Sequence, residues 1–218
     1  MVTGDLRDRN DMPTLKRPST QKEIQAFRRL TLVEGALKSI AAHGLHGTTV
    51  QTISESSGSS RGLVNHYFKN KDELIVAAYR HLADEWESRV SAFMRESGKP
   101  AETRLKALAT ASFHADVLDP KWLKAYLAFW SEAQHSPSLH NVNREVNTHY
   151  RAAVTRLFAR AGAEKGCAID AESAAIGLLA LIDGLWLQLA VQTADLDSSS
   201  AQATCHTYID RLLMPIAR

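Results

Sequence analysis

The apolar residues of this chain recur at helical rather than strand spacing. Leu30, Val33, Leu37 and Ile40 lie three or four residues apart, which is the spacing of one face of an α-helix, and Gly44 follows as a stop signal. No segment shows the alternation of apolar and polar residues that marks a half-buried strand. The pattern predicts an all-α fold of about nine helices.

Capping residues divide the chain into further helices. Thr48-x-x-Gln51 reads as a capping box for a short helix that ends near Ser57-Gly58. Ser60 can cap a second short helix from Arg61 to about Phe68, and Asn70-x-x-Glu73 opens a much longer one. Later helix starts are predicted at Asp119-Pro120, Ser136-Pro137, Asp170 and 198–200.

The segment AAIGLLALIDGLWLQLAV, which follows Asp170, is the most apolar part of the chain. It is apolar around much of its circumference and must be covered on several sides. Two interpretations stay open: a central core helix of one subunit, or half of a four-helix interface formed with the last helix and a second copy. We expect no apolar run to approach the roughly twenty residues that span a bilayer, and no signal peptide, so the sequence predicts a soluble cytoplasmic protein.

Composition adds a charge asymmetry to this picture. The 218-residue chain is 44% hydrophobic and carries a net charge of +2, but residues 1–75 hold eleven Lys and Arg against eight Asp and Glu. The positive end is therefore the N-terminal one, where a polyanion-binding element would lie. The two cysteines, Cys167 and Cys205, are far apart and suit a reducing compartment.

Two short helices joined by a Gly-Ser turn, from Thr48 to Phe68, have the organisation of a helix-turn-helix, whose second helix lies in the DNA major groove. The chemistry of the second helix agrees: Arg61 suits guanine, Asn65 suits adenine and Leu63 suits a thymine methyl group. Gly62 removes a side chain where the backbone would approach DNA. Phosphate contacts are expected from the hydroxyls at the two helix starts, from residues beside the groove and from basic residues before it: Thr49, Ser60, His66, Tyr67, Lys71, Lys16, Arg17, Lys22, Arg28 and Arg29.

The stretch TTVQTISESSGSSRGLVNHYFKNKDEL resembles the N-terminal signature of the TetR family of bacterial regulators. The shared pattern includes Thr49-Val50, Ile53, Gly58, Ser60-x-Gly62 and Tyr67-Phe68. The sequence departs from it at Asn65, where many members carry Tyr, and at Ser56 and Ser59. The resemblance implies that these residues contact DNA: Thr49, Gln51, Ser60, Arg61, Gly62, Leu63, Asn65, His66, Tyr67 and Lys71.

A stripe of aromatic residues occupies the segment DPKWLKAYLAFWSEA. Trp122, Tyr126, Phe129 and Trp130 fall on one helix face, where such a stripe is usually core packing. Rings that converge around a gap instead form a cage for a quaternary ammonium group, and Trp186 could supply another wall. A cation would also need a carboxylate, for which there are three candidates. Asp116 reads as a helix-end charge, Glu132 as part of a solvated face and Asp183 as a hydrogen-bonded structural acid.

The segments KAYLAFWSEAQHSPSL and GLLALIDGLWLQLA resemble the C-terminal domain of BetI-type members, the choline-responsive repressors of that family. The resemblance implies three parts: a flexible arm (1–20), a helix-turn-helix domain (21–70) and a ligand-sensing and dimerisation domain (71–218). It implies a homodimeric repressor that binds palindromic operator DNA and is released by choline or a related quaternary amine.

Other classes of function are weaker. No phosphate-binding loop, nucleophile elbow, catalytic carboxylate pair or metal-ligand spacing is found, so we expect no enzyme, no metal and no cofactor. Two alternatives remain: a regulator of the same type that senses a lipophilic ligand such as an efflux substrate, and a helical adaptor that binds protein instead of DNA.

Overall fold

The structure of the chain is a computed structural model that describes residues 20–94, 98–114, 118–191 and 196–214. Within these ranges the ordered elements are all helices, which confirms the predicted fold class. They are α1 (Gln21–Gly47), α2 (Val50–Ser57), α3 (Arg61–Tyr67), α4 (Lys71–Met94), α5 (Ala101–Ser112), α6 (Pro120–Ala133), α7 (Pro137–Lys165), α8 (Ala171–Val191) and α9 (Ser198–Leu212). The predicted arm lies outside the described residues up to position 19.

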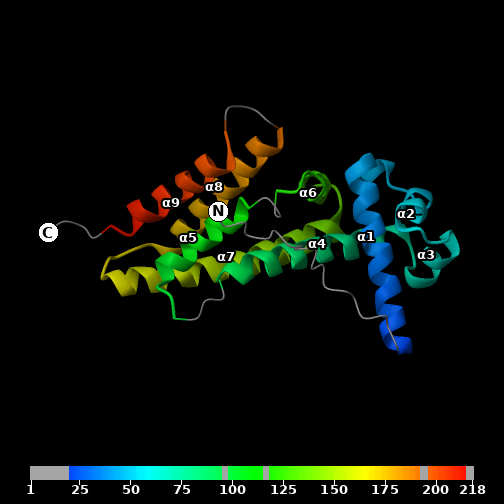
Figure 1. Ribbon diagram of the computed structural model, residues 1–218, viewed down its shortest axis with the longest axis horizontal. Helices are drawn as coiled ribbons and strands as arrows, with labels where there is room; N and C mark the ends of the chain where they lie inside the picture. Colours follow the sequence, from blue (N-terminus) through cyan, green and yellow to red (C-terminus); the bar gives the residue numbers. More distant parts are fainter. Residues whose placement is uncertain (1–19, 95–97, 115–117, 192–195, 215–218) are drawn as a thin grey trace, which may run out of the picture.

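Helices α1, α2 and α3 gather at one end of an elongated molecule, and we call them, with the start of α4, the reading head (Figure 1). Ile53 of α2 and Val64 and Phe68 at α3 are buried against α1. Gly35 lets α1 and α2 cross closely, because a Cβ atom there would lie 2.4 Å from Cβ of Ser57. Gly58 closes α2 in the left-handed conformation (φ 66°), which glycine adopts without strain.

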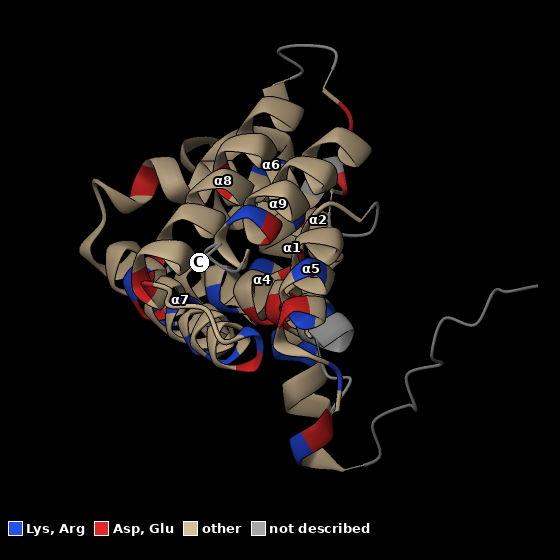
Figure 2. Cartoon of the chain, turned by 90° about the vertical axis from the view of Figure 1, so that its left-hand side faces the viewer, with Lys and Arg blue, Asp and Glu red and all other residues tan. Residues whose placement is uncertain are grey.

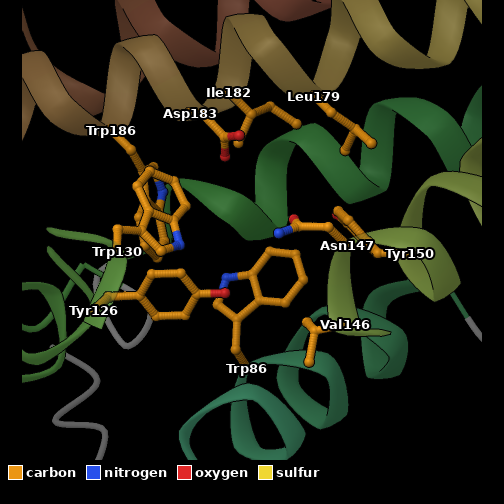
Figure 3. Close-up of a pocket in the computed structure, with 10 residues that line it drawn as sticks. All are labelled: Trp86, Tyr126, Trp130, Val146, Asn147, Tyr150, Leu179, Ile182, Asp183 and Trp186. Carbon is orange, nitrogen blue, oxygen red and sulfur yellow. The ribbon is translucent and has the colours of Figure 1, made fainter. Parts of the chain in front are cut away.

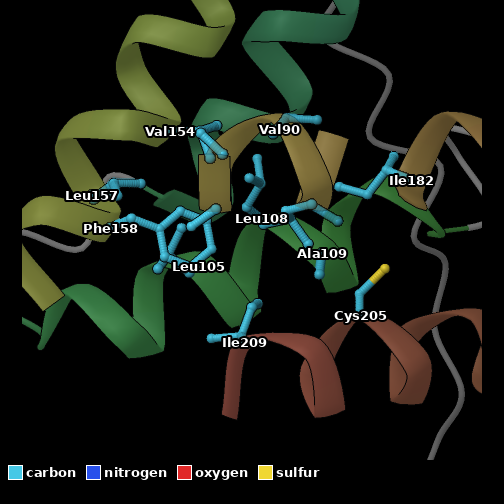
Figure 4. Packing of buried hydrophobic residues seen from close by; sticks show 14 of the residues in the cluster. Val90, Leu105, Leu108, Ala109, Val154, Leu157, Phe158, Ile182, Cys205 and Ile209 are labelled. Atoms are coloured by element: carbon cyan, nitrogen blue, oxygen red, sulfur yellow. The ribbon is translucent and has the colours of Figure 1, made fainter. Parts of the chain in front are cut away.

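The second core lies at the other end of the molecule, between α5, α7, α8 and α9. Leu105 and Leu108 of α5, Phe158 of α7 and Ile209 of α9 meet there with almost no solvent exposure (Figure 4). Helices α4 and α7 run along the long axis and reach from this core to the reading head (Figure 1). Helix α4 therefore belongs to both ends: its first half packs into the reading head, and Val90 packs into the second core.

Most predicted helix starts are confirmed, but the first cap is displaced by one residue. Thr49, not Thr48, caps α2, and its hydroxyl accepts a hydrogen bond from the Thr52 amide at 3.2 Å. Thr48 is buried, and its hydroxyl donates to the Gly44 carbonyl. Gly44 (φ 70°) has a non-helical conformation and kinks α1 at the predicted stop, and helical residues continue beyond it to Gly47.

The expectation about apolar runs is wrong. Helix α8 has the length and hydropathy of a membrane span, the one helix of this kind in the described ranges. Its only charged residues are Glu172 and Asp183, and it appears almost uniformly tan in Figure 2. The core helix of a soluble protein passes the same test. Here one side of α8 packs on α7 and α9, while the opposite side exposes Ile176, Leu187 and Val191.

Candidate functional site

Nine of the ten residues that the family signature assigned to DNA lie on α2, on α3 or at their N-caps, and the tenth, Lys71, begins α4. None of the ten is buried. Thr49, Gln51, Ser60, Arg61, Gly62, Asn65 and His66 are exposed, whereas Leu63, Tyr67 and Lys71 are partly covered. The buried residues of these helices, such as Val64, face α1 instead. The two short helices thus present their polar side outward, as a DNA-reading surface requires.

Gly62 supports this orientation. A Cβ atom at this position would meet nothing closer than the Ser60 hydroxyl at 3.8 Å, so packing within the chain does not require glycine there. Glycine in a helix costs about 1 kcal/mol relative to alanine. A surface that must approach another backbone closely would explain that cost.

Three polar residues at this surface also hold the head together. Lys71 Nζ donates to the Thr48 carbonyl at 3.2 Å, and the Arg29 guanidinium donates to the Tyr67 carbonyl at 3.2 Å. Arg29 also lies over the Phe68 ring, 4.2 Å from its centre. The Gln51 amide donates to Glu55 on the same helix. Lys71 and Arg29 therefore have structural contacts as well as positive charge.

A pocket of about 490 Å³, including its part open to solvent, lies between α4, α6, α7 and α8 (Figure 3). The lining residues are Trp86, Tyr126, Trp130, Val146, Asn147, Tyr150, Leu179, Ile182, Asp183 and Trp186.

Five aromatic rings form most of the wall. Tyr126 meets Trp130 edge to face at 5.3 Å between ring centres and Trp186 at 5.9 Å, and Trp86 meets Tyr150 at 4.7 Å. The Trp186 indole N–H donates to the Ser112 carbonyl at 2.6 Å, which fixes that ring. Burial raises the pKa of Tyr126 and of Tyr150, so both hydroxyls stay protonated. Faces of this kind attract cations.

Asp183 supplies a carboxylate at this wall (Figure 3). Its side chain forms no hydrogen bond to the described residues, so the prediction of a hydrogen-bonded structural acid is wrong. The Asp183 side chain is exposed to solvent on one side, but the surrounding protein partly desolvates the carboxyl and raises its pKa from 3.8 to about 6. A carboxylate in this environment is poorly solvated, and a cation beside it would relieve that penalty.

The residues of the predicted aromatic stripe lie in different surroundings. Tyr126, Trp130 and Trp186 line the pocket. Phe129 is fully buried elsewhere and stacks on Tyr79 at 4.5 Å, because successive helix residues point about 100° apart. Trp122 lines a smaller neighbouring cavity, so we leave Phe129 and Trp122 out of the ligand site.

Of the other two candidate acids, Glu132 is not among the residues that line the pocket. Glu132 contacts His46 of α1 at 3.3 Å, and Asp116 lies outside the described residues. Conversely, Trp86, Asn147 and Tyr150 were not predicted as ligand residues. Trp86 keeps a buried indole N–H without a partner in the described part of the chain. The helices of these three residues carry no motif, so only the packing reveals them.

Comparison with known proteins places both regions in one family. Residues 32–78 match the family of bacterial regulatory proteins, tetR family, and residues 101–214 match the BetI-type transcriptional repressor C-terminal family. The chain is 37% identical over 196 residues to the HTH-type transcriptional regulator BetI of Burkholderia mallei, covering 88% of this chain and 96% of the relative.

Two solved structures share the fold. A transcriptional regulator of Pseudomonas aeruginosa PAO1 is 32% identical with a TM-score of 0.79, over 86% of this chain and 91% of that one. A regulator of Saccharomonospora viridis, solved in complex with choline, is 21% identical with a TM-score of 0.76, over 85% and 96%. The families and relatives are regulators, which confirms that the chain is not an enzyme.

Proposed function

The chain belongs to the TetR family and carries a BetI-type C-terminal domain, so it is a transcriptional repressor with a DNA-binding helix-turn-helix. From this premise we propose that it binds operator DNA in the cytoplasm as a homodimer and is released by choline or a related small quaternary amine. The observation that carries the proposal is the aromatic pocket with one poorly solvated carboxylate, Asp183, at its wall.

A homodimer explains the uncovered side of α8. Ile176, Leu187 and Val191 expose 47, 48 and 53% of their surface along one face of that helix. Gly184 lies on the same face, and a Cβ atom there would meet no atom of this chain within 4 Å. A second α8 packing against this face would cover the apolar side chains. One recognition helix buries too little surface for specific binding, whereas a two-fold dimer presents two helices about 34 Å apart.

The pocket favours a small cation over a neutral ligand. Trp86, Trp130 and Trp186 line the pocket, and a cation held over the face of such a ring gains about 0.5–2 kcal/mol of cation–π attraction. Asp183 adds an opposite charge in a desolvated position. A purely lipophilic ligand would satisfy the rings but leave this partly desolvated carboxylate without an opposite charge. For this reason we place choline before the lipophilic alternative.

Release would act through α4, which carries Trp86 of the pocket and also packs into the reading head. A ligand that binds better to one tilt of α4 shifts the dimer towards that tilt and changes the separation of the two recognition helices. Only its differential affinity for the two states can drive this change.

The test starts with duplex DNA selected from a random library by the full chain. Choline is then compared with 3,3-dimethylbutan-1-ol, a neutral molecule of nearly the same shape. We expect choline to raise the Kd for the selected duplex about 5–150-fold, the usual range of allosteric coupling, and the neutral molecule to have little effect. Equal release by both would overturn the cationic ligand in favour of a lipophilic one. Failure to select any duplex, with no salt-dependent retention, would favour the protein-binding adaptor.

A further inference from the structure

A chain of hydrogen bonds joins the pocket wall to the reading head. Asn147, on α7, lines the pocket, and its amide end points into the space between Asp183 and Trp86 (Figure 3). Its Nδ2 donates to the Oδ1 of Asn143 and to the Asn143 carbonyl oxygen, both at 2.9 Å. The hydroxyl of Tyr79, on α4, donates to the same Oδ1 at 2.7 Å. One acceptor atom of Asn143 therefore receives a donor from the pocket and a donor from α4.

Tyr79 occupies the junction between pocket and reading head. It is fully buried within the cluster that contains the α1 core residues and the buried residues of α2 and α3. Its ring stacks on Phe129 at 4.5 Å and meets the edge of Tyr126, a pocket residue, at 6.1 Å. Burial raises the pKa of Tyr79, so its hydroxyl remains a donor at neutral pH.

The Oδ1 of Asn143 has no acceptor capacity left over for a third donor. A carbonyl oxygen has two lone pairs, and the Oδ1 of Asn143 receives two donors. A ligand oxygen beside Asn147 would compete for its Nδ2 hydrogens and draw the amide into the pocket. Asn143 would then be free to turn, and the Tyr79 hydroxyl, which is buried, would have to follow its acceptor.

We propose that Asn147, Asn143 and Tyr79 form a polar relay that couples occupation of the pocket to the reading head, and that the effector must carry an oxygen acceptor as well as a cation. Asp183 and the aromatic rings hold the cation. Asn147 donates a hydrogen bond to the ligand oxygen, and the resulting change in its bond to Asn143 reaches Tyr79 on α4. Asn143 and Tyr79 touch no ligand themselves and act as positioning residues. The identity of the cation rests on the function proposed above, whereas the relay does not.

The relay predicts that a ligand without an oxygen can bind in the pocket and still fail to release the DNA. Tetramethylammonium has the cationic part of choline and no oxygen. We expect both tetramethylammonium and choline to quench the fluorescence of the pocket tryptophans. The change in log Kd for the operator should be less than about a third as large with tetramethylammonium as with choline. If tetramethylammonium binds and releases DNA as fully as choline, the required oxygen is refuted.

Tyr79→Phe removes only the relay hydroxyl and keeps the stacking on Phe129. We expect this variant to bind choline within about threefold of the wild type, while the ratio of operator Kd values with and without choline falls close to one. Tyr208→Phe is the matched control, because its hydroxyl donates to the Ala174 carbonyl at 3.2 Å, away from the pocket. If circular dichroism shows both variants folded and the ratio of operator Kd values with and without choline is the same in Tyr79→Phe as in the wild type, the relay is refuted.

A double-mutant cycle on the operator Kd, measured without ligand, tests the relay independently of choline. Tyr79→Phe and Asn147→Ala should each raise the ligand-free operator Kd severalfold, and the double variant should be no weaker than either single one, because all three break the same relay. Asn141→Ala, on the exposed part of α7, is the control for Asn147→Ala. Additive effects, or no effect of either substitution, would refute the relay. If choline does not bind the wild type but this cycle is non-additive, the proposed effector fails and the relay stands.

Discussion

Replacing Asp183 by asparagine separates the stability of the protein from its ligand affinity. The substitution keeps the shape of the side chain and removes its charge. Because desolvation raises the pKa of Asp183 from 3.8 to about 6, the folded protein holds the proton more tightly than the unfolded chain does. The carboxyl therefore favours folding most below pH 4. This contribution disappears as the pH rises through about 6, and above that pH the penalty for the partly desolvated carboxylate remains.

The magnitude follows from the two pKa values. At 1.36 kcal/mol for each factor of ten, the rise from 3.8 to about 6 sets an upper limit of roughly 3 kcal/mol. Because the Asp183 side chain is exposed to solvent, screening of its charge reduces this limit to about 1–2 kcal/mol. Without ligand at pH 7.5, Asp183→Asn should therefore be more stable than the wild type, and its Tm should rise by roughly 2–8 °C. At pH 4 the difference should shrink towards zero.

The affinity for the ligand should fall in Asp183→Asn, whereas the stability of the protein should rise. Loss of one partner of a desolvated charge pair typically costs about 2–5 kcal/mol, so the Kd of Asp183→Asn for choline should rise at least about 30-fold. Thermal unfolding followed by circular dichroism, with and without choline, measures both effects. Asp84→Asn, exposed on α4, is the control. A variant that is no more stable at pH 7.5 and binds choline like the wild type would show that Asp183 is not the acid of the pocket.

Four other outcomes test the remaining parts of the structure. Trp130→Leu should raise the choline Kd about 2–30-fold by calorimetry, whereas Trp122→Leu, on the same helix but outside the pocket, should leave it within about twofold. In the wild type, choline should bind more tightly as the pH rises through about 6 and change little above that, because the cation pairs with ionised Asp183. Gly35→Ala should destabilise the reading head by about 1–3 kcal/mol, since its Cβ would lie 2.4 Å from Cβ of Ser57; an unchanged Tm would contradict this crossing of α1 and α2. Leu187→Arg should give a monomer in analytical ultracentrifugation and reduce retention on the selected duplex, and a stable dimer would place the interface elsewhere.

Local signals in the sequence determined most of the fold, including the helix-turn-helix and the residues that it leaves unburied. Ser60 at the start of α3, Gly58 at the turn and the spacing of Ile53 and Val64 act over fewer than twenty residues. Interactions of this range depend on backbone conformation and helical period, which a single sequence displays directly. The displaced cap at Thr49 is the kind of error expected there, because two adjacent threonines offer the same chemistry.

The sequence predicted only some of the residues that line the pocket. Tyr126 and Trp130 belong to a stripe on one helix, and Trp186 stood out in an apolar segment, so their ring chemistry was evident. The same stripe also suggested Phe129, because the sequence shows which residues share a helix face but not which neighbour covers each part of it.

Only the tertiary structure decided which side chains meet in the pocket. Trp86 comes from α4, Asn147 and Tyr150 from α7 and Asp183 from α8, and these helices converge through packing between residues far apart in the chain. The desolvation of Asp183 and the shared acceptor on Asn143 likewise arise only when several helices surround one point. Helical spacing is a property of one segment, whereas burial and convergence are properties of the whole assembly of helices, and for that reason the sequence displays the first and not the second.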